Sequence, residues 1–157
     1  MNVNIRKAEK KDMPQVLKLI KELAAFEKEP DAVEVTVADL EKEGFDNKLF
    51  SCFVAETETE IVGMALVYFR FSTWKGRNVH LEDLVVSEAY RGKGIGTKLY
   101  KRVMQFAKEH QVNRAQWIVL NWNEKAIKMY ENSGATFHKD WWVVLMDSEG
   151  ITKNSED

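Results

Sequence analysis

Three glycines within five positions, Gly92, Gly94 and Gly96, separate a run typical of a β-strand from a run typical of a helix. Residues 81–86 before them are mostly aliphatic, and apolar side chains recur at helical steps after them as far as about His110. Glycine lets backbone N–H groups approach a ligand closely, and the first turn of a helix offers unpaired N–H groups and positive potential to an anion. The segment therefore predicts either a phosphate-binding loop or a turn that lets the helix pack on a sheet.

The pattern around this segment predicts a mixed α/β fold of the α+β type, with a mostly antiparallel central sheet flanked by helices. Apolar residues at three- and four-residue steps predict helices over residues 13–26, 36–44, 95–110 and 123–132. Runs of β-branched and aromatic residues predict strands over residues 3–8, 52–56, 61–71, 78–86 and 114–120, and one or two more within residues 135–146. We expect one domain over residues 1–147, followed by a polar, frayed tail over residues 148–157.

The first of these helices has a start signal in the sequence. Asp12 stands where a side chain can cap the helix, and Pro14 falls in the first turn, where proline is tolerated. Gln15 is three residues after Asp12, the spacing that closes a capping box. We therefore expect Asp12 and Gln15 to cap this helix reciprocally.

The composition excludes several classes of function. The 25 acidic and 23 basic residues nearly balance and are spread along the chain, so no nucleic-acid partner is expected. The apolar runs are short and the N-terminus has no signal-peptide core, so we expect a cytoplasmic protein with no membrane partner. Cys52 is the single cysteine and lies in a strand-like run, which favours packing over a nucleophilic role. His80, His110 and His138 lack the spacing of a zinc site, so no metal is expected.

Two well-known phosphate loops do not fit residues 91–96. A dinucleotide fingerprint needs a glycine where Thr97 stands, and a P-loop needs a wider gap closed by Gly-Lys-Ser/Thr. The pattern of arginine, two residues, glycine, one residue and glycine, formed by Arg91, Gly94 and Gly96, resembles instead the pyrophosphate-binding motif of the GNAT N-acyltransferase superfamily. The strand before the motif and the short helix after it lie at separations similar to those of that superfamily.

Further segments are similar to the diamine and polyamine acetyltransferases of the spermidine/spermine type. They are Lys21 to Glu27, Trp74 to Gly76, Leu81 to Val86, Tyr90 to Gly96, Trp122 to Glu124, and Tyr130 with Gly134 and Ala135. The resemblance covers nearly the whole chain and implies the GNAT fold, acetyl-CoA as cosubstrate and a homodimer. Two positions depart from the family pattern, since Phe26 stands where those enzymes often carry tyrosine and Trp142 replaces a more polar residue. Both departures bear on the identity of the substrate.

The resemblance also implies where the cosubstrate binds. Backbone N–H groups at the end of the preceding strand would contact the pantetheine arm and an oxyanion, and the glycine loop would hold the diphosphate. Asn123 can cap the downstream helix or bond the pantetheine, and the two roles are compatible. The cofactor-binding residues implied in this way are Leu84, Val85, Val86, Arg91, Gly92, Lys93, Gly94, Ile95, Gly96, Thr97, Asn123, Lys125, Ala126 and Tyr130.

An amine acceptor needs a base, because an alkyl ammonium with a pKa of about 10.4 leaves roughly one molecule in a thousand neutral at pH 7. The resemblance implies that Glu82 deprotonates the amine, directly or through a water; the alternative is a solvated strand carboxylate. Glu82 and Asp83 are neighbours on a strand and should face opposite sides. Both can serve one site only if a bulge or splay turns the strand there, in which case Asp83 would contact the substrate.

Tyr130 is the general acid that the resemblance implies. Release of a thiolate is helped by a nearby donor, and the resemblance places Tyr130 beside the thioester. A phenol with a pKa of about 10 is not fully matched to a thiol near about 8.5, so re-protonation from solvent must follow. Without the resemblance, Tyr130 is better interpreted as an aromatic side chain packed on a helix face with Ile127.

A cationic substrate also needs carboxylates and aromatic walls along its length. Acidic residues cluster within residues 27–34, where Glu27 matches the acidic substrate position of the family, and Trp74 can provide a cation–π wall. The alternative for the cluster is a solvated face. The substrate-binding residues implied are Phe26, Glu27, Trp74, Glu82 and Asp83.

These observations predict an enzyme that moves the acetyl group of acetyl-CoA to a primary amine by direct attack in a ternary complex. The expected acceptor is a small cationic amine, namely a diamine, a polyamine or a lysine-like molecule. Two alternatives stay open: transfer to a protein lysine, a protein N-terminus or an aminoglycoside, and a module that binds acyl-CoA without turnover.

Overall fold

A computed structural model describes residues 2–156, and the chain divides into two compact units, one ending at Ile118 and the other beginning at Val119. The helices of the first unit are α1 (Met13–Phe26), α2 (Val37–Glu41) and α3 (Ile95–Glu109), with short 3-10 or π turns η1 (Lys10–Asp12), η2 (Lys42–Asp46) and η3 (Glu88–Tyr90). Its strands are β1 (Asn4–Lys7), β2 (Ser51–Glu56), β3 (Ile61–Ser72), β4 (Gly76–Val86) and β5 (Ala115–Gln116). The second unit contains α4 (Glu124–Asn132) and α5 (Ser148–Ser155).

The first unit is built on one five-stranded sheet in the order β1-β2-β3-β4-β5. Strands β2 to β4 form an antiparallel meander, in line with three strand-like runs separated by short polar turns, and β1 pairs antiparallel with β2 although two helices separate them in sequence. Strand β5 joins the outer edge of β4 in parallel, at Val79 and His80 only. The prediction of a mixed, mostly antiparallel sheet with flanking helices is confirmed.

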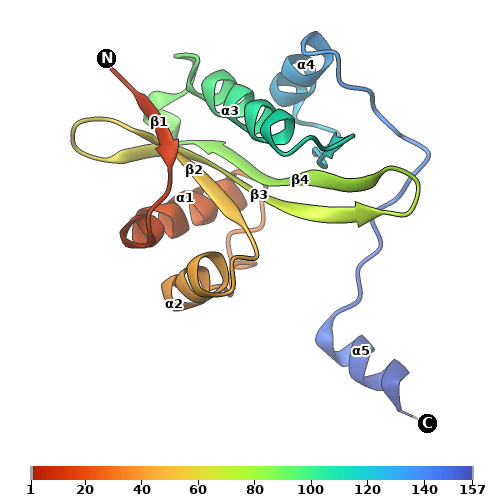
Figure 1. The fold of residues 1–157 in the computed structure, drawn as a ribbon. Coiled ribbons are helices and arrows are strands. Elements are labelled where there is room, and N and C mark those ends of the chain that lie inside the picture. The colour runs from red at the N-terminus through yellow and green to blue at the C-terminus, as the bar shows by residue number, and fades with distance from the viewer. Residues whose placement is uncertain (1, 157) are drawn as a thin grey trace. The chain divides into compact units, whose positions relative to one another are not determined.

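Helices cover both faces of this sheet. Helices α1 and α2 lie on one face and α3 lies on the other (Figure 1). Because successive side chains of a strand point to opposite faces, neighbouring residues of β2 serve different cores. Phe53 packs with Leu99 and Val103 of α3, whereas Val54 packs with Val16 of α1. The sheet is therefore buried on both sides, which gives β4 a rigid support.

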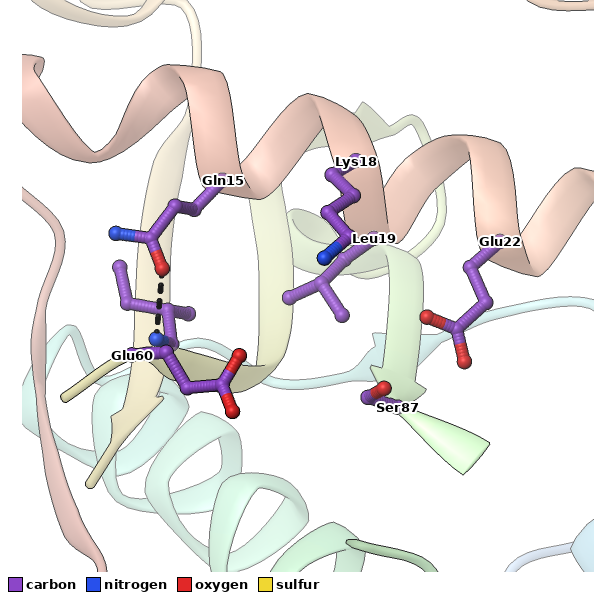
Figure 2. Close-up of a pocket in the computed structure, with 7 residues that line it drawn as sticks. Gln15, Lys18, Leu19, Glu22, Glu60 and Ser87 are labelled. Carbon is purple, nitrogen blue, oxygen red and sulfur yellow. Dashed lines mark hydrogen bonds between the residues drawn. The ribbon is translucent and has the colours of Figure 1, made fainter. Parts of the chain in front are cut away.

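The expected reciprocal cap at the start of α1 is wrong. Asp12 is the N-cap residue, but its side chain accepts hydrogen bonds from Arg6 Nη1 and from the Glu9 N–H, both at 2.7 Å, and from no N–H of α1. Gln15 Oε1 accepts instead from the backbone N–H of Ile61 at 2.8 Å, the contact drawn as a dashed line in Figure 2. Both side chains are used in contacts with neighbouring elements, which a capping pattern cannot anticipate.

Three expectations for the C-terminal third of the chain are also corrected. The strand expected over residues 114–120 is limited to β5. No strand forms within residues 135–146, because no other strand among the described residues pairs with them, and Trp142 is 88% exposed. The tail is helical rather than frayed, since Asp147 Oδ1 accepts from the Gly150 N–H at 2.8 Å and caps α5.

Other expectations concern the chain as a whole. No helix within residues 2–156 combines the length and the apolar character needed to cross a membrane, and the cytoplasmic location stays a prediction. Cys52 is buried in β2, and burial raises the pKa of its thiol to about 12, in keeping with a packing role. The described residues contain no group of three or more His, Cys, Asp or Glu side chains that could hold a metal ion. The single domain over residues 1–147 also stays a prediction.

Candidate active site

The glycine-rich segment links β4 to α3 through the turn η3. Gly94 is the N-cap residue of α3 with a φ of 78°, and Gly92 has a φ of 75°, a backbone region that favours glycine. A Cβ atom built on either glycine would meet no atom within 4 Å, so both backbones border open space. No side chain caps the first turn of α3. Backbone N–H donors at a helix start therefore border space that an anion could enter.

Arg91 braces this loop against α1. Its Nε donates to the Val86 carbonyl at 2.9 Å, its Nη2 lies 3.8 Å from Glu22 Oε1, and its guanidinium lies 5.1 Å from the centre of the Phe26 ring. The same Glu22 oxygen accepts from the backbone N–H of Glu88 at 2.7 Å. The brace connects the end of β4 to α1 and brings Phe26, an expected substrate residue, next to an expected cofactor residue.

A small pocket of about 60 Å³ lies beside this brace (Figure 2). It is lined by side chains of α1, the β2–β3 turn and the end of β4, namely Gln15, Lys18, Leu19, Glu22, Glu60, Ile61 and Ser87. Pockets for drug-sized ligands and cofactors measure roughly 300 Å³ or more. The hollow is therefore too small for a cosubstrate, and the candidate active site lies along β4 instead.

A bulge interrupts β4 at Glu82. Leu66 of β3 pairs with Asp83 and Val67 pairs with Leu81, so Glu82 has no partner across the ladder. An extra residue in one strand bends it and resets the alternation of its side chains. The bulge that joint use of Glu82 and Asp83 requires is therefore present.

The Glu82 carboxyl is held by two neighbours. Its Oε2 accepts from the Tyr68 hydroxyl at 3.1 Å and lies 3.2 Å from His80 Nε2. Tyr68 and His80 face each other across the β3–β4 ladder, and Tyr68 packs on the α1 side of the sheet. The hydrogen bond with His80, and then that with Tyr68, lower the pKa of Glu82 and outweigh the effect of burial. Glu82 is thus kept as a carboxylate.

Asp83 and Glu27 add two more carboxyl groups on the same side. Asp83 pairs with Leu66, whose side chain belongs to the core under α1. Burial, and then the charges of Glu82 and Glu27, raise the pKa of Asp83 to about 6. Glu27 is the C-cap residue of α1, and burial raises its pKa. The charges of Glu82 and Glu27 thus both act on Asp83, and a group of three carboxyls of this kind stabilises a bound cation.

The outer edge of β4 is open beyond the bulge. Since β5 pairs with β4 at Val79 and His80 only, no strand of residues 2–156 pairs with this edge over residues 81–86. The backbone of Leu84, Val85 and Val86 therefore leads along an unpaired edge into the glycine loop. An extended ligand with amide groups could bond to such an edge.

Trp74 does not lie with the carboxyl groups. It is 83% exposed in the turn between β3 and β4, where its backbone N–H donates to Ser72 Oγ at 3.2 Å. The strand from Gly76 to Glu82 spans roughly 20 Å. Trp74 therefore stands at the end of β4 opposite to the glycine loop.

The remaining candidate residues belong to the second unit. Asn123 caps α4 as expected, because its side chain accepts from the Ala126 N–H at 3.3 Å. Lys125, Ala126 and Tyr130 lie within α4. The part that these four residues play in binding and catalysis stays a prediction.

The sequence patterns did not predict the groups that hold Glu82 and the loop. His80 stands two positions before Glu82, and residues at this spacing share a face of a regular strand, so the signal was available. Tyr68 lies on another strand, and no sequence spacing links it to Glu82. Glu22 likewise meets Arg91 only because α1 packs beside the end of β4.

The sheet, the glycine loop at the start of α3 and the open edge of β4 define the fold class of the N-acyltransferases. Residues 13–135 match the acetyltransferase (GNAT) family, and the chain belongs to that family. Enzymes of this family use acetyl-CoA. The resemblance drawn from the residues alone is confirmed.

Individual relatives agree with this assignment. The chain is 44% identical over 139 residues to human spermidine/spermine N(1)-acetyltransferase-like protein 1, with 83% of this chain and 20% of that protein covered, so it spans a fifth of this relative. It is 41% identical over 162 residues to pig thialysine N-epsilon-acetyltransferase, with 96% of this chain and 95% of that enzyme covered. An integron cassette protein of V. cholerae has a similar structure, with a TM-score of 0.80 and 25% identity over 100% of this chain and 99% of that one. The protein is thus an acetyltransferase that acts on an amine.

Proposed function

We propose that this enzyme transfers the acetyl group of acetyl-CoA to a primary amine of a diamine, a polyamine or a lysine-like molecule, within a ternary complex. The main support for this proposal is the path of β4. The strand that bears Glu82 and Asp83 at its bulge runs on into the glycine loop at Gly92 and Gly94. A cationic acceptor and an anionic donor would therefore bind along one strand.

The loop fits the diphosphate of acetyl-CoA. The open space beside Gly92 and Gly94 would be filled by any side chain, and the first turn of α3 supplies N–H donors. Arg91 and Lys93 add positive charge. The unpaired edge at residues 84–86 suits the amides of the pantetheine arm. When bound, acetyl-CoA supplies a thioester carbonyl carbon that an amine can attack.

The carboxyl groups prepare the amine. Asp83 and Glu27 attract the cationic substrate, and Glu82 takes the proton of the ammonium, directly or through a water. The freed nitrogen lone pair then forms the new C–N bond as the C–S bond breaks. The nitrogen loses a second proton as the amide forms, and this proton balances, through solvent, the one that the departing thiolate takes up. Glu82 passes the first proton to solvent, so the reaction yields an N-acetyl amine, free CoA and one proton.

Tyr130 is proposed to protonate the departing thiolate. Tyr130→Phe is expected to lower kcat on the order of a hundredfold, because general acid catalysis contributes at least about this much. The KM for acetyl-CoA should change little, since the hydroxyl acts after binding. Steady-state thiol-release kinetics measure both constants. Tyr100→Phe, which removes a hydroxyl from α3, is the control and should keep its kcat; an unchanged kcat in Tyr130→Phe would contradict the assignment.

The substrate class is tested by release of free CoA from acetyl-CoA over a panel of amines. We expect turnover with short diamines, polyamines or lysine-like amines, supported by the similarity to enzymes named for spermidine/spermine and thialysine. If free CoA is released only with a protein lysine, a protein N-terminus or an aminoglycoside, that acceptor is the substrate and the proposed class of small amines is wrong. If CoA stabilises the protein against heat but no amine is acetylated, the protein is a module that binds acyl-CoA without turnover.

A homodimer is part of the proposal. Residues 141–146 form a continuous apolar run with every side chain at least 60% exposed, and exposed apolar patches of this kind mark interaction surfaces. Light scattering after gel filtration should give twice the 18.2 kDa mass of the chain. Trp142→Glu combined with Val144→Lys should give the mass of one chain. If the wild-type protein has the mass of a single chain, the proposed homodimer is contradicted.

A further inference from the structure

Glu82 is held through one of its two oxygens. The Tyr68 hydroxyl at 3.1 Å and His80 Nε2 at 3.2 Å both contact Oε2. No group within residues 2–156 forms a hydrogen bond or ion pair with Oε1. Since half of the side chain is exposed, Oε1 is the oxygen that a ligand can reach.

Arg70 determines which nitrogen of His80 carries the proton. Arg70 Nη1 lies 3.4 Å from His80 Nδ1. A guanidinium has only donors, so Nδ1 must be the acceptor and the ring proton lies on Nε2. His80 therefore presents an N–H group to the Glu82 carboxylate, while its other nitrogen faces a cation.

The position of the His80 ring is set by its packing. His80 is 8% exposed, and its ring centre lies 5.0 Å from that of Tyr68, its partner across the ladder. Tyr68 is itself half-buried against the core under α1. Both donors to Glu82 are thus in place before any substrate arrives, which is the condition for a preorganised site.

We propose that His80, oriented by Arg70, is a positioning residue that together with Tyr68 fixes Glu82 Oε2 and leaves Oε1 as the oxygen that accepts the proton of the substrate amine. The inference rests on the proposed role of Glu82 as the base. One proton moves from the ammonium nitrogen to Oε1, and the electron pair of the broken N–H bond stays on nitrogen. His80 and Tyr68 keep their own protons throughout.

Loss of the His80 donor has a predictable effect on the pH profile. The charged and titratable groups around Glu82 are His80 and Asp83 on β4, Tyr68 and Arg70 on β3, and Glu27 at the end of α1, which faces Asp83. The bond from His80 lowers the pKa of Glu82, so its removal raises that pKa. The active form is the carboxylate, and activity is lost as the pH falls through the pKa. The acidic limb of kcat/KM must therefore move to higher pH.

The test compares His80→Leu, which has no donor, with His80→Gln, whose amide can donate from a similar position. In His80→Leu the acidic limb should move up by roughly one pH unit and the plateau kcat should fall roughly tenfold. The KM for acetyl-CoA should not change. His80→Gln should return the limb to its wild-type position, and His138→Gln, a change at an exposed histidine, should leave the whole profile unchanged.

The outcomes separate this inference from the proposed function. If Glu82→Gln keeps the wild-type kcat, the base assignment itself fails. If Glu82→Gln is inactive while His80→Leu and His80→Gln both keep the wild-type limb, only the role of His80 is overturned. Nitrogen NMR of the wild-type protein gives a second readout that needs no variant: a His80 ring with its proton on Nε2 is expected, and a proton on Nδ1 would overturn the inference.

Discussion

Gly94→Val is expected to abolish measurable binding of CoA, with an affinity at least about a hundredfold below that of the wild type. Gly94 has a φ of 78°, where a β-branched residue costs roughly 1–3 kcal/mol of backbone strain. The new side chain would also occupy the open space beside the loop, in which the diphosphate is proposed to lie. Isothermal titration calorimetry with CoA measures the effect directly.

Gly76→Val is the matched control for this experiment. Gly76 has the same φ of 78° and the same open surroundings, but it is the first residue of β4, at the end of the strand far from the glycine loop. It should show a similar loss of thermal stability with wild-type affinity for CoA. Binding retained by Gly94→Val, or lost equally in both variants, would remove the assignment of the loop to the cosubstrate.

Glu82→Gln is expected to lower kcat by a factor of about 10² to 10³, the range in which general bases act. Glutamine keeps the shape of the side chain, and its carbonyl can still accept from Tyr68 and His80, but it cannot take a proton from the substrate. The KM for acetyl-CoA should stay near the wild-type value, because this carboxyl is not proposed to contact the cosubstrate. Initial rates of thiol release over a range of amine and acetyl-CoA concentrations provide both constants.

Asp83→Asn distinguishes the roles of the two neighbouring carboxyl groups. Asp83 has a pKa raised to about 6, so its negative charge is present above that pH and is lost as the pH falls through it. If Asp83 attracts the cationic substrate, Asp83→Asn should raise the KM for the amine more than it lowers kcat. A large loss of kcat in Asp83→Asn together with a nearly normal Glu82→Gln would transfer the role of base to Asp83.

The opposite pKa shifts of Glu82 and Asp83 explain how two neighbouring carboxyl groups can take different roles. The bulge turns Glu82 and Asp83 to one side of β4, and their surroundings move the two pKa values in opposite directions. Hydrogen-bond donors keep Glu82 charged, whereas burial and neighbouring charges favour a proton on Asp83. Pairs of titratable groups separated in this way commonly divide acid–base roles between them.

The composition of residues 141–146 favours an extended backbone, yet the strand predicted there does not form. Two tryptophans, two valines, a leucine and a methionine are typical of a strand. A strand also needs a neighbour to pair its backbone groups, and no other strand among the described residues provides one. Side-chain composition predicts a preference for extended backbone, whereas pairing depends on the rest of the assembly.

The sequence by itself determined the long helices, the meander of β2, β3 and β4 and the place of the glycine loop. These features depend on periodicity and on glycine chemistry, which act between residues close in the chain. The alternation of side chains along a strand is also a local property. The sequence could therefore predict that Glu82 and Asp83 share a site only if a bulge interrupts the strand.

Only the tertiary structure decided that the bulge exists and which groups meet there. Tyr68 reaches Glu82 from β3, Arg70 orients His80, and Glu22 of α1 braces the loop. Such contacts join residues up to 66 positions apart, and their geometry follows from strand register and helix packing. No local pattern carries that information, because a shift of one residue in register would turn the same side chains to the other face of the sheet.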